Sequence, residues 1–365
     1  MNRFELQAVA PANPPCLQGV QSTLFAPAPN EVQLRVIASS INPIDVKRAA
    51  GYGRRLLSLK KAGTFPLVLG NDVVGEIEAM GAQVQDFAVG DRVIGLRPTS
   101  GRGGTHVSHL HLAASQLRHL PVGCDPIASA TLPYSFTTVW LALADAGLSP
   151  ESAKGRQVLV HGASGVLGQL ALRILQGWEA EVTAVCRGVD ASLCLALGAK
   201  TVIDRTQAKW RSLDARFDAT LNFAVWEDER WLLEHLKPGA LGHATTVHPL
   251  LGHIDQHGWL GGVWRVLRDL SAHRALARKS AGSQCRYAWT VFRPDASALD
   301  ALVADLRAKP FGMPVGLVVP LAQGQQAFDD LARGAAGRAV LLGDKKSDFH
   351  NPARHFNTGD AKATI

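Results

Sequence analysis

The stretch QVLVH-GASGVLG-QLALRILQG, residues 157–177, decides how the middle of this chain folds. Its centre is the turn Gly162-Ala163-Ser164-Gly165-Val166-Leu167-Gly168, which follows an apolar run typical of a buried strand and opens an apolar helical stretch. Glycines permit a tight turn and let the backbone approach a diphosphate, and the N–H groups at a helix start bind that anion. With a second apolar run at residues 182–186, the stretch predicts a nucleotide site rather than a merely structural turn.

The sequence on either side of this turn changes character near residue 127. Apolar runs at residues 201–203, 219–222 and 241–247 alternate with helical stretches, which predicts an α/β fold with a parallel sheet and crossover helices. Residues 31–39 alternate apolar and polar side chains, which predicts a half-buried strand. Before residue 127, such short strands and turns are typical of a compact, partly open β-barrel. Residues 250–280 read as a loop leading into a basic amphipathic helix, and the polar tail 344–365 is expected to be disordered or loosely docked.

Length and composition limit the class of protein. The 365 residues suggest about two domains, and a chain that is 47% hydrophobic and 19% charged can bury a large core. The net charge of +7 permits an anionic ligand, a nucleic acid or a membrane surface without choosing among them. Five scattered cysteines exclude a disulfide scaffold. No signal peptide or run of about 18 apolar residues stands out, so we expect a soluble, cytoplasmic protein.

The end of the apolar run at residues 182–186 indicates which nucleotide binds. Enzymes that use NAD usually place an acidic residue there, whereas NADP sites place a cation for the ribose 2′-phosphate. Here Arg187 follows the run, and no carboxylate occurs until Asp190. A guanidinium is well suited to a phosphate, so the sequence favours NADPH. The alternative interpretation of Arg187 is a solvated surface arginine.

Several further motifs, taken in order, resemble the medium-chain dehydrogenase/reductase superfamily. They are residues 41–45 (INPID), 65–75 (FPLVLGNDVVG), 89–93 (VGDRV), 103–107 (GGTHV), 138–140 (TVW), 197–199 (LGA) and 237–239 (KPG). The resemblance spans roughly residues 20–343. It implies a GroES-like substrate domain over residues 1–127, a Rossmann domain with a doubly wound parallel sheet over residues 128–285, and a return to the first domain over residues 286–343.

The same resemblance places the chain in a branch without zinc. Zinc-dependent members carry a cysteine where this chain has Asn42 and a histidine where it has Asn71, and neither asparagine offers a ligand that zinc prefers. The four-cysteine lobe of those members is also absent. The chain is similar to the zinc-free quinone oxidoreductases, and segments 45–53, 287–289 and 292–295 look closest to the reticulon-interacting mitochondrial reductases. No metal site is expected.

The chemistry that the resemblance implies is hydride transfer to a quinone or an α,β-unsaturated carbonyl. Such conjugated acceptors spread the incoming charge onto an oxygen, so positioning and hydrogen-bond donors replace the metal. The resemblance places Asn42 and Thr138 near the nicotinamide and makes Tyr52 the candidate proton donor. Related enoyl reductases have their tyrosine one residue later, so the alternative is that Tyr52 only lines the pocket.

The resemblance also assigns residues to the cofactor. The glycine turn, Gly162, Ser164, Gly165, Val166, Leu167 and Gly168, should hold the diphosphate. Residues after later strands should follow the dinucleotide along the carboxyl edge of the sheet. Phe292 should wall the pocket, and Arg338 stands where the family often has a lysine near the cofactor. The residues after later strands are Asn222, Phe223, Ala224 and Thr245.

Other readings of the sequence remain open. Within enzymes, the alternative is an enoyl-thioester or polyketide-type enone reductase; outside them, it is a low-turnover NADPH-binding sensor or docking protein. The basic helix over residues 263–279 is either a solvated face or a membrane-surface or partner-binding helix. Residues 106–111 (HVSHLH) are expected to be a plain strand, and no basic platform for nucleic acid is present. Dimers are common in this family, which allows a homodimer.

Overall fold

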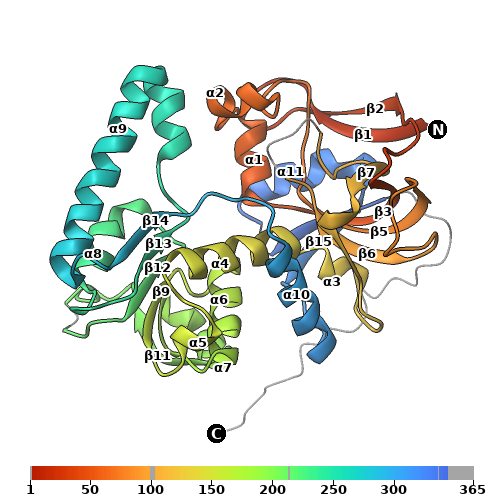
Figure 1. Cartoon of the computed structure of the whole chain (residues 1–365). Coiled ribbons are helices and arrows are strands. Elements are labelled where there is room, and N and C mark those ends of the chain that lie inside the picture. Colours follow the sequence, from red (N-terminus) through yellow and green to blue (C-terminus); the bar gives the residue numbers. More distant parts are fainter. Residues whose placement is uncertain (1, 99–102, 213, 336, 344–365) are drawn as a thin grey trace, which may run out of the picture.

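The computed structural model of this chain describes residues 2–98, 103–212, 214–335 and 337–343. Figure 1 shows a parallel sheet covered by helices, coloured from yellow-green to teal, beside a barrel-like group of strands in red and orange. The tail at residues 344–365, expected to be disordered, lies outside the described residues.

The first part is built from two groups of strands, whose neighbours pair antiparallel except for β15 and β16, which run parallel. Strand β3 is central to the larger sheet and alternates buried with partly exposed residues over its first half, as residues 31–39 predict. The sheet orders are β2-β1-β4 and β15-β16-β3-β5-β6-β8, with β7 paired to β3. The strands are β1 (Asn2–Ala8), β2 (Leu17–Thr23), β3 (Glu31–Ile41), β4 (Leu67–Val68), β5 (Asp72–Met80), β6 (Arg92–Leu96), β7 (His109–Ala113), β8 (Leu117–His119), β15 (Val315–Pro320) and β16 (Arg338–Leu342).

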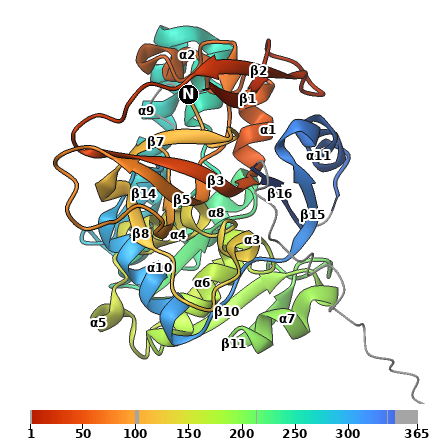
Figure 2. The same ribbon diagram turned by 90° about the vertical axis from the view of Figure 1, so that its right-hand side faces the viewer.

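Short helices complete this part. Figure 2 shows the blue C-terminal segment returning from the parallel sheet to the barrel, where α11 lies beside β15 and β16. The helices are α1 (Pro43–Ala49), α2 (Arg54–Leu57), α3 (Pro126–Ser129) and α11 (Gly324–Ala332).

The second part is the parallel sheet expected around the glycine turn. Its order is β11-β10-β9-β12-β13-β14, and the paired strands all run parallel. The strands are β9 (Gln157–His161), β10 (Glu181–Cys186), β11 (Ala199–Asp204), β12 (Ala219–Asn222), β13 (Gly242–Thr245) and β14 (Arg286–Trp289). The helices are α4 (Pro133–Asp145), α5 (Pro150–Ala153), α6 (Val166–Gly177), α7 (Ala191–Ala196), α8 (Glu229–Glu234), α9 (Leu250–Ala281) and α10 (Ala296–Ala308).

Strand β14 lies on the other side of the domain boundary expected at residue 285. The segment 286–343 is predicted to belong to the first domain, yet residues 286–289 pair with β13 as the outermost strand of the parallel sheet. The chain then crosses to α10, which packs against both α4 and β8, and only β15 rejoins the barrel. The boundary at residue 285 therefore differs from the structure.

Residues 250–262 do not form the expected loop. They belong to α9, which consists of two helical arms joined at Gly258, where φ is 68° and ψ is −171°. Figure 1 shows the chain reversing direction there, so α9 is a helical hairpin. The arms are held together because His253 Nε2 lies 2.9 Å from Asp269 Oδ2, and a Cβ added at Gly262 would lie 2.7 Å from the His253 carbonyl oxygen. Glycine lowers helix propensity, but here it lets the arms approach closely.

Helix α4 joins the two parts into one core. It packs against α6, β13 and β14 on one side and against β5 and β6 on the other. A single apolar cluster accordingly contains Val74 and Ile94 of the barrel together with Val158 and Val160 of the parallel sheet. The glycine turn is thus fixed relative to the barrel. In the part of the chain that the structure describes, no helix is both long and apolar enough to cross a membrane.

Candidate functional site

The glycine turn has the backbone geometry that an anion cradle needs. Gly162 has φ of +81°, a conformation that side-chain-bearing residues rarely adopt. The N–H groups of Gly162 and Ala163 both donate to the Val185 carbonyl, which ties the turn to β10. A Cβ added at Gly168 would lie 2.3 Å from the Gly162 carbonyl oxygen, so the helix packs directly on the turn.

The first turn of α6 is open toward an anion. The helix begins at Val166, its N-cap is the exposed Gly165, and no side chain caps it. The first N–H groups of a helix have no partner within that helix, and they carry its positive dipole end. Val166, Leu167 and Gly168 therefore offer backbone donors where a diphosphate is expected. The residues present fit a dinucleotide.

The neighbouring strand ends lie beside this turn. A Cβ added at Gly162 would lie 3.0 Å from Ala224 Cβ, and the Phe223 N–H donates to the His161 carbonyl. Asn222 and Thr245 are register partners at the ends of β12 and β13. The structure thus brings Gly162, Asn222, Phe223, Ala224 and Thr245 to one edge of the sheet, as the resemblance implies.

The Asn222 side chain is nevertheless occupied by the protein itself. Its amide nitrogen donates to the Val225 carbonyl and to Glu229 Oε2, each at 2.8 Å, and its oxygen accepts the Ala224 N–H. Asn222 therefore shapes the loop that follows β12, and its backbone carbonyl accepts the Thr246 N–H.

Arg187 lies at the carboxyl end of β10 with its side chain exposed. Its Nε donates to Asp190 Oδ2 at 3.0 Å, which folds the guanidinium back onto the chain. Asp190 also accepts a hydrogen bond from Ser164 of the glycine turn. Ser164, Arg187 and Asp190 thus form one polar group at the position expected for the adenosine ribose.

A buried polar cluster lies at the boundary between the barrel and α4. Asp72 is fully buried and accepts hydrogen bonds from Ser40 Oγ at 2.6 Å, Asn42 Nδ2 at 2.7 Å and the Tyr134 N–H at 2.5 Å. Burial raises the pKa of Asp72 although these donors oppose the shift. Asn42 therefore has its amide orientation fixed by a carboxyl group.

Arg338 belongs to this cluster. Its Nη1 donates to Asn42 Oδ1 at 2.7 Å, and its Nη2 donates to Ser135 Oγ. The side chain is buried, and burial lowers the pKa of its guanidinium although Asp72 opposes the shift. Arg338 therefore holds Asn42 from the side opposite Asp72, instead of lying free beside the cofactor as the family's lysine suggests.

Aromatic rings extend the cluster toward the sheet edge. Tyr134 packs on Phe292 with ring centroids 4.3 Å apart, and the Thr138 hydroxyl donates to the Tyr134 carbonyl one helical turn earlier. The Thr290 N–H, two residues before Phe292, donates to the Thr245 carbonyl. A continuous path of contacts therefore runs from the glycine turn through Thr245 and Phe292 to the barrel cluster.

Tyr52 lies between the barrel and α9. It is partly buried in the turn before α2, and burial together with Asp255 raises the pKa of its phenol, which therefore stays protonated at neutral pH. Asp255 Oδ2 accepts the Gly53 N–H at 2.5 Å, and its Oδ1 accepts the Arg55 N–H at 3.1 Å. A carboxylate of the hairpin thus holds the loop that carries Tyr52.

Sequence reasoning missed four residues of this arrangement: Asp72, Tyr134, Ser135 and Asp255. Asp72 and Tyr134 each lie beside a residue that the sequence did single out, since Asp72 follows Asn71 and Tyr134 precedes Thr138 by one helical turn. Asp255 gave no signal, because its segment reads as a loop.

The residues weighed as metal ligands are engaged elsewhere. Asn71 Nδ2 donates to the Arg97 carbonyl, and His106 Nε2 lies 3.1 Å from the Ser40 carbonyl oxygen. Among residues 2–98, 103–212, 214–335 and 337–343, no group of three or more histidine, cysteine or acidic side chains is arranged to hold a metal ion.

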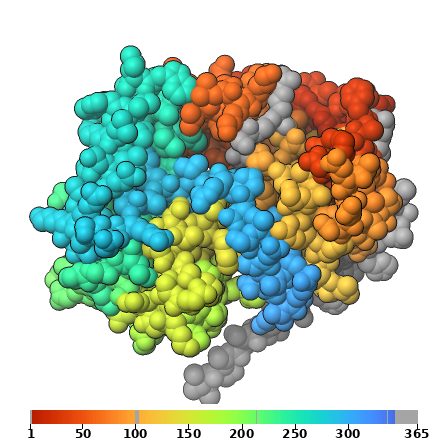
Figure 3. All heavy atoms as spheres, in the orientation of Figure 1, coloured from red at the N-terminus to blue at the C-terminus, as the bar shows by residue number. Residues whose placement is uncertain are grey.

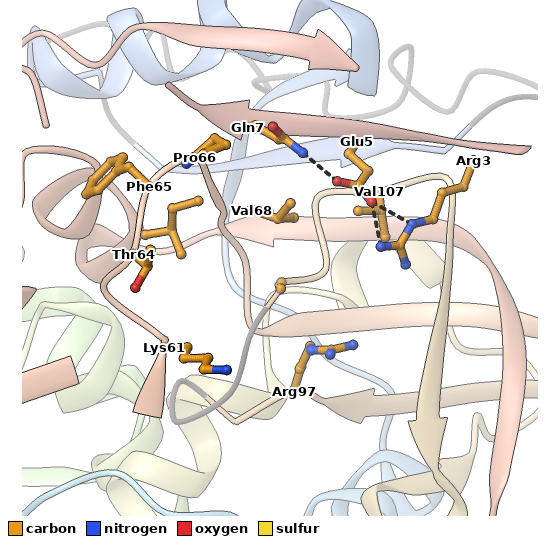
Figure 4. Close-up of a pocket in the computed structure, with 13 residues that line it drawn as sticks. Arg3, Glu5, Gln7, Lys61, Thr64, Phe65, Pro66, Val68, Arg97 and Val107 are labelled. Atoms are coloured by element: carbon orange, nitrogen blue, oxygen red, sulfur yellow. Dashed lines mark hydrogen bonds and ion pairs between the residues drawn. The ribbon is translucent and has the colours of Figure 1, made fainter. Parts of the chain in front are cut away.

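A separate cavity of about 370 Å³ lies within the barrel part (Figure 4). Glu5 in its wall accepts hydrogen bonds from Gln7 and Arg3, and Arg97 and Lys61 face the same space. None of its lining residues comes from the parallel sheet, so it is distinct from the sheet edge described above.

Known proteins resemble this chain over most of its length. Residues 28–117 match the alcohol dehydrogenase GroES-like domain family. The mitochondrial NAD(P)H oxidoreductase RTN4IP1 of Mus musculus is 32% identical over 328 residues, covering 86% of this chain and 82% of that protein. The chloroplast envelope quinone oxidoreductase homolog of Arabidopsis thaliana is 31% identical over 215 residues, covering 57% of this chain and 64% of that protein.

Solved structures share the fold. The quinone oxidoreductase from Coxiella burnetii has a TM-score of 0.76 at 19% identity, over 94% of this chain and 99% of that chain. The CurK enoyl reductase has a TM-score of 0.72 at 21% identity, over 93% of this chain and 99% of that chain. The predicted fold class, a GroES-like β-barrel domain with a Rossmann parallel sheet, is confirmed.

The expected cytoplasmic location is wrong on these comparisons. The RTN4IP1 relatives from zebrafish, mouse, cattle and human are mitochondrial by name, and the Arabidopsis relative is named for the chloroplast envelope. Those names point to an organelle, a conclusion that the composition of the chain did not suggest.

Proposed function

Because this chain belongs to the medium-chain dehydrogenase/reductase superfamily, in its zinc-free quinone oxidoreductase branch, and is an NAD(P)H-dependent oxidoreductase, we propose that it transfers hydride from NADPH to a quinone or an α,β-unsaturated carbonyl. The observation that carries the proposal is the path of contacts from the glycine turn to the Asn42 cluster, because it ties the expected dinucleotide cradle to a set of buried polar side chains of the barrel. When bound, the nicotinamide supplies the hydride.

The cradle acts through backbone atoms. The N–H groups of Val166, Leu167 and Gly168 bind the diphosphate, because the helix start leaves them without partners and glycine keeps the approach open. Arg187 binds the ribose 2′-phosphate in exchange for its exposed ion pair with Asp190. Since exposed ion pairs contribute only about 0–1 kcal/mol, a dianionic phosphate can displace that carboxylate.

The barrel residues orient the acceptor. Asp72 accepts a hydrogen bond from the Asn42 amide nitrogen, and Arg338 donates one to the amide oxygen. The amide orientation is therefore fixed before the reaction, which removes the entropy cost of ordering it. Asn42 and Thr138 lie beside the nicotinamide in this proposal. The Thr138 hydroxyl, which donates its proton to the Tyr134 carbonyl, can still accept a hydrogen bond there, whereas the Asn42 amide nitrogen is directed at Asp72 and Ser40. Phe292 and Tyr134 supply an apolar wall against which a flat quinone ring packs.

Tyr52 donates the proton that completes reduction. Its phenol stays protonated at neutral pH because burial and Asp255 both disfavour the phenolate. This donor would serve a second acceptor class equally well, the enoyl thioester, since saturation of its carbon–carbon double bond, like that of an enone, requires a proton at carbon after the hydride arrives.

The test is NADPH oxidation against para- and ortho-quinones, simple enones and an enoyl-CoA, with NADH run alongside each. We expect turnover with quinones or enones and a preference for NADPH. Turnover confined to enoyl-CoA would assign the second acceptor class. NADPH binding without turnover across the panel would refute the reductase proposal and support a sensor or docking role.

A further inference from the structure

The hairpin α9 exposes more apolar surface than its place on the parallel sheet requires. Figures 1 and 3 show it in teal at the upper left, where it projects past the sheet. Near its tip, Leu260 is 91% exposed, Trp264 59% and Leu267 61%, and Trp259 and Val263 are also exposed. Large exposed apolar patches on folded proteins mark surfaces that contact a membrane or another protein.

These residues lie on one face of the longer arm. At 100° per residue, positions 259, 260, 263, 264 and 267 fall within a sector of about 140°, and positions 274 and 278 fall in the same sector. The exposed arginines Arg274 and Arg278 therefore continue the apolar stripe toward the other end of the arm. We name this set the docking face: Trp259, Leu260, Val263, Trp264, Leu267, Arg274 and Arg278.

Helix α2 and the residues after it place further positive charge beside the hairpin tip. A Cβ added at Gly258 would lie 3.8 Å from the Arg55 guanidinium, so α2 lies beside the hairpin tip. Arg54 and Lys60 are exposed on the same segment, and Leu59 between them is 69% exposed. Within the residues that the structure describes, no ion pair neutralises Arg54, Arg55, Arg274 or Arg278, whereas Arg268 is paired with Asp269.

We propose that the docking face, together with α2, binds the protein to a lipid surface that carries anionic headgroups. Tryptophan and leucine beside arginine are the residues that let a helix lie in the interface, with rings at the headgroup level and guanidinium groups on the phosphates. A second copy of this chain is a poorer occupant, because a two-fold contact would set the basic face against itself. An acidic lipid surface satisfies both the apolar and the positive side chains.

Docking in this way would also serve a lipid-dissolved acceptor. The hairpin that carries the docking face holds, through Asp255, the loop with Tyr52. Bound lipid would therefore lie next to the loop that carries Tyr52. The binding proposal itself does not depend on the reductase activity, and its test measures binding first.

The experiment is flotation of the full chain with vesicles of pure phosphatidylcholine and of phosphatidylcholine mixed with phosphatidylglycerol. The apolar variant is Leu260→Ser with Trp264→Ser, and its control is Phe25→Ser with Val122→Ser, which removes exposed apolar groups elsewhere. The charge variant is Arg274→Gln with Arg278→Gln; its control, Arg307→Gln with Lys309→Gln, makes the same charge change at the C-terminal end of α10. All of these side chains are exposed, so the variants should fold.

We expect the wild-type chain to float with the anionic vesicles and to be released by salt. The apolar variant should lose at least about tenfold in partition coefficient, and the charge variant about thirtyfold, since each arginine near an anionic surface contributes about one kcal/mol. Both controls should float as the wild type does. If the chain proves active, the two docking-face variants should reduce a long-chain quinone in vesicles more slowly and a water-soluble quinone at the wild-type rate.

Three results would overturn the proposal. One is absence of the wild-type chain from anionic vesicles. Another is undiminished flotation of both docking-face variants. The third is a dimer, measured by sedimentation equilibrium, that Leu260→Ser with Trp264→Ser dissociates while lipid binding is absent, because the face would then belong to a second copy. Failure of the quinone assay alone would count against the proposed function and leave the binding result standing.

Discussion

Replacing Gly168 by alanine tests whether the glycine turn holds a diphosphate through its backbone. The new Cβ would lie 2.3 Å from the Gly162 carbonyl oxygen and 2.5 Å from Ala163 Cα, and both are backbone atoms that no side-chain rotation can move. The turn must therefore shift by about 1 Å to restore ordinary contact, which we expect to cost about 1–3 kcal/mol in free energy of unfolding. A displacement of this size at a binding turn lowers kcat/KM for NADPH by about 100-fold.

Two other glycines serve as matched controls. At Gly165 a Cβ would approach only the Gly162 carbonyl oxygen, at 3.3 Å, and φ is −73°, so Gly165→Ala should cost less. At Gly177, the last residue of α6, a Cβ meets nothing within 4 Å, so Gly177→Ala should leave activity unchanged. Urea unfolding and steady-state kinetics are measured for all three. Equal kcat/KM for Gly168→Ala and Gly177→Ala would refute the assignment of the turn to the diphosphate.

Other perturbations separate the remaining roles. Arg187→Ala should lower the ratio of kcat/KM for NADPH to that for NADH by about 10- to 100-fold, the loss expected of one charge-assisted phosphate contact, and an unchanged ratio would make Arg187 a surface residue. Tyr52→Phe should lower kcat by about 100-fold with KM unchanged, and wild-type turnover would leave the ring as pocket lining. His243, Asn222 and other donors outweigh burial to hold the pKa of Glu229 below its usual value, so its stabilisation is present above about pH 4.5 and is lost as pH falls through the depressed pKa. The free energy of unfolding of Glu229→Gln should therefore be about 2–4 kcal/mol lower than that of the wild type at pH 7, and should fall little further on acidification. Urea unfolding at a series of pH values measures this, and a fall below about pH 4.5 as steep as that of the wild type would contradict it.

Local pattern predicted the fold well where burial is uniform or periodic. The apolar run before Gly162 becomes a buried central strand, and the alternation at residues 31–39 becomes β3, because each pattern reports directly which faces are covered. The hairpin α9 escaped the same reasoning. Its glycines argue against a helix locally, whereas close packing of its arms, as at Gly262 against His253, requires them.

The candidate site shows the same division. The tight turn at Gly162 and the close backbone packing at Gly168 could be predicted, because a short glycine motif requires both. Asp72 and Asp255 could not, since each gains its role from partners distant in sequence: Asp72 from Tyr134 and Asp255 from Gly53. The direction of the Arg338 side chain likewise depends on a buried carboxyl group that only the folded chain brings near it.

The hairpin connects these observations to location. The relatives of this chain are named for organelles. Its helical hairpin carries exposed tryptophan and leucine side chains and also holds the loop that carries Tyr52. Asp255 links the two, because the same arm that ends at the exposed tip accepts the N–H groups of that loop. Lipid binding at the tip would therefore change the position of Tyr52. A reductase that acts only on water-soluble acceptors would not need this link between the hairpin tip and the Tyr52 loop. Comparing Asp255→Asn with the wild type on vesicle-bound and soluble quinones distinguishes these cases: loss on both acceptors assigns Asp255 to positioning the loop alone, and loss confined to vesicles couples the loop to docking.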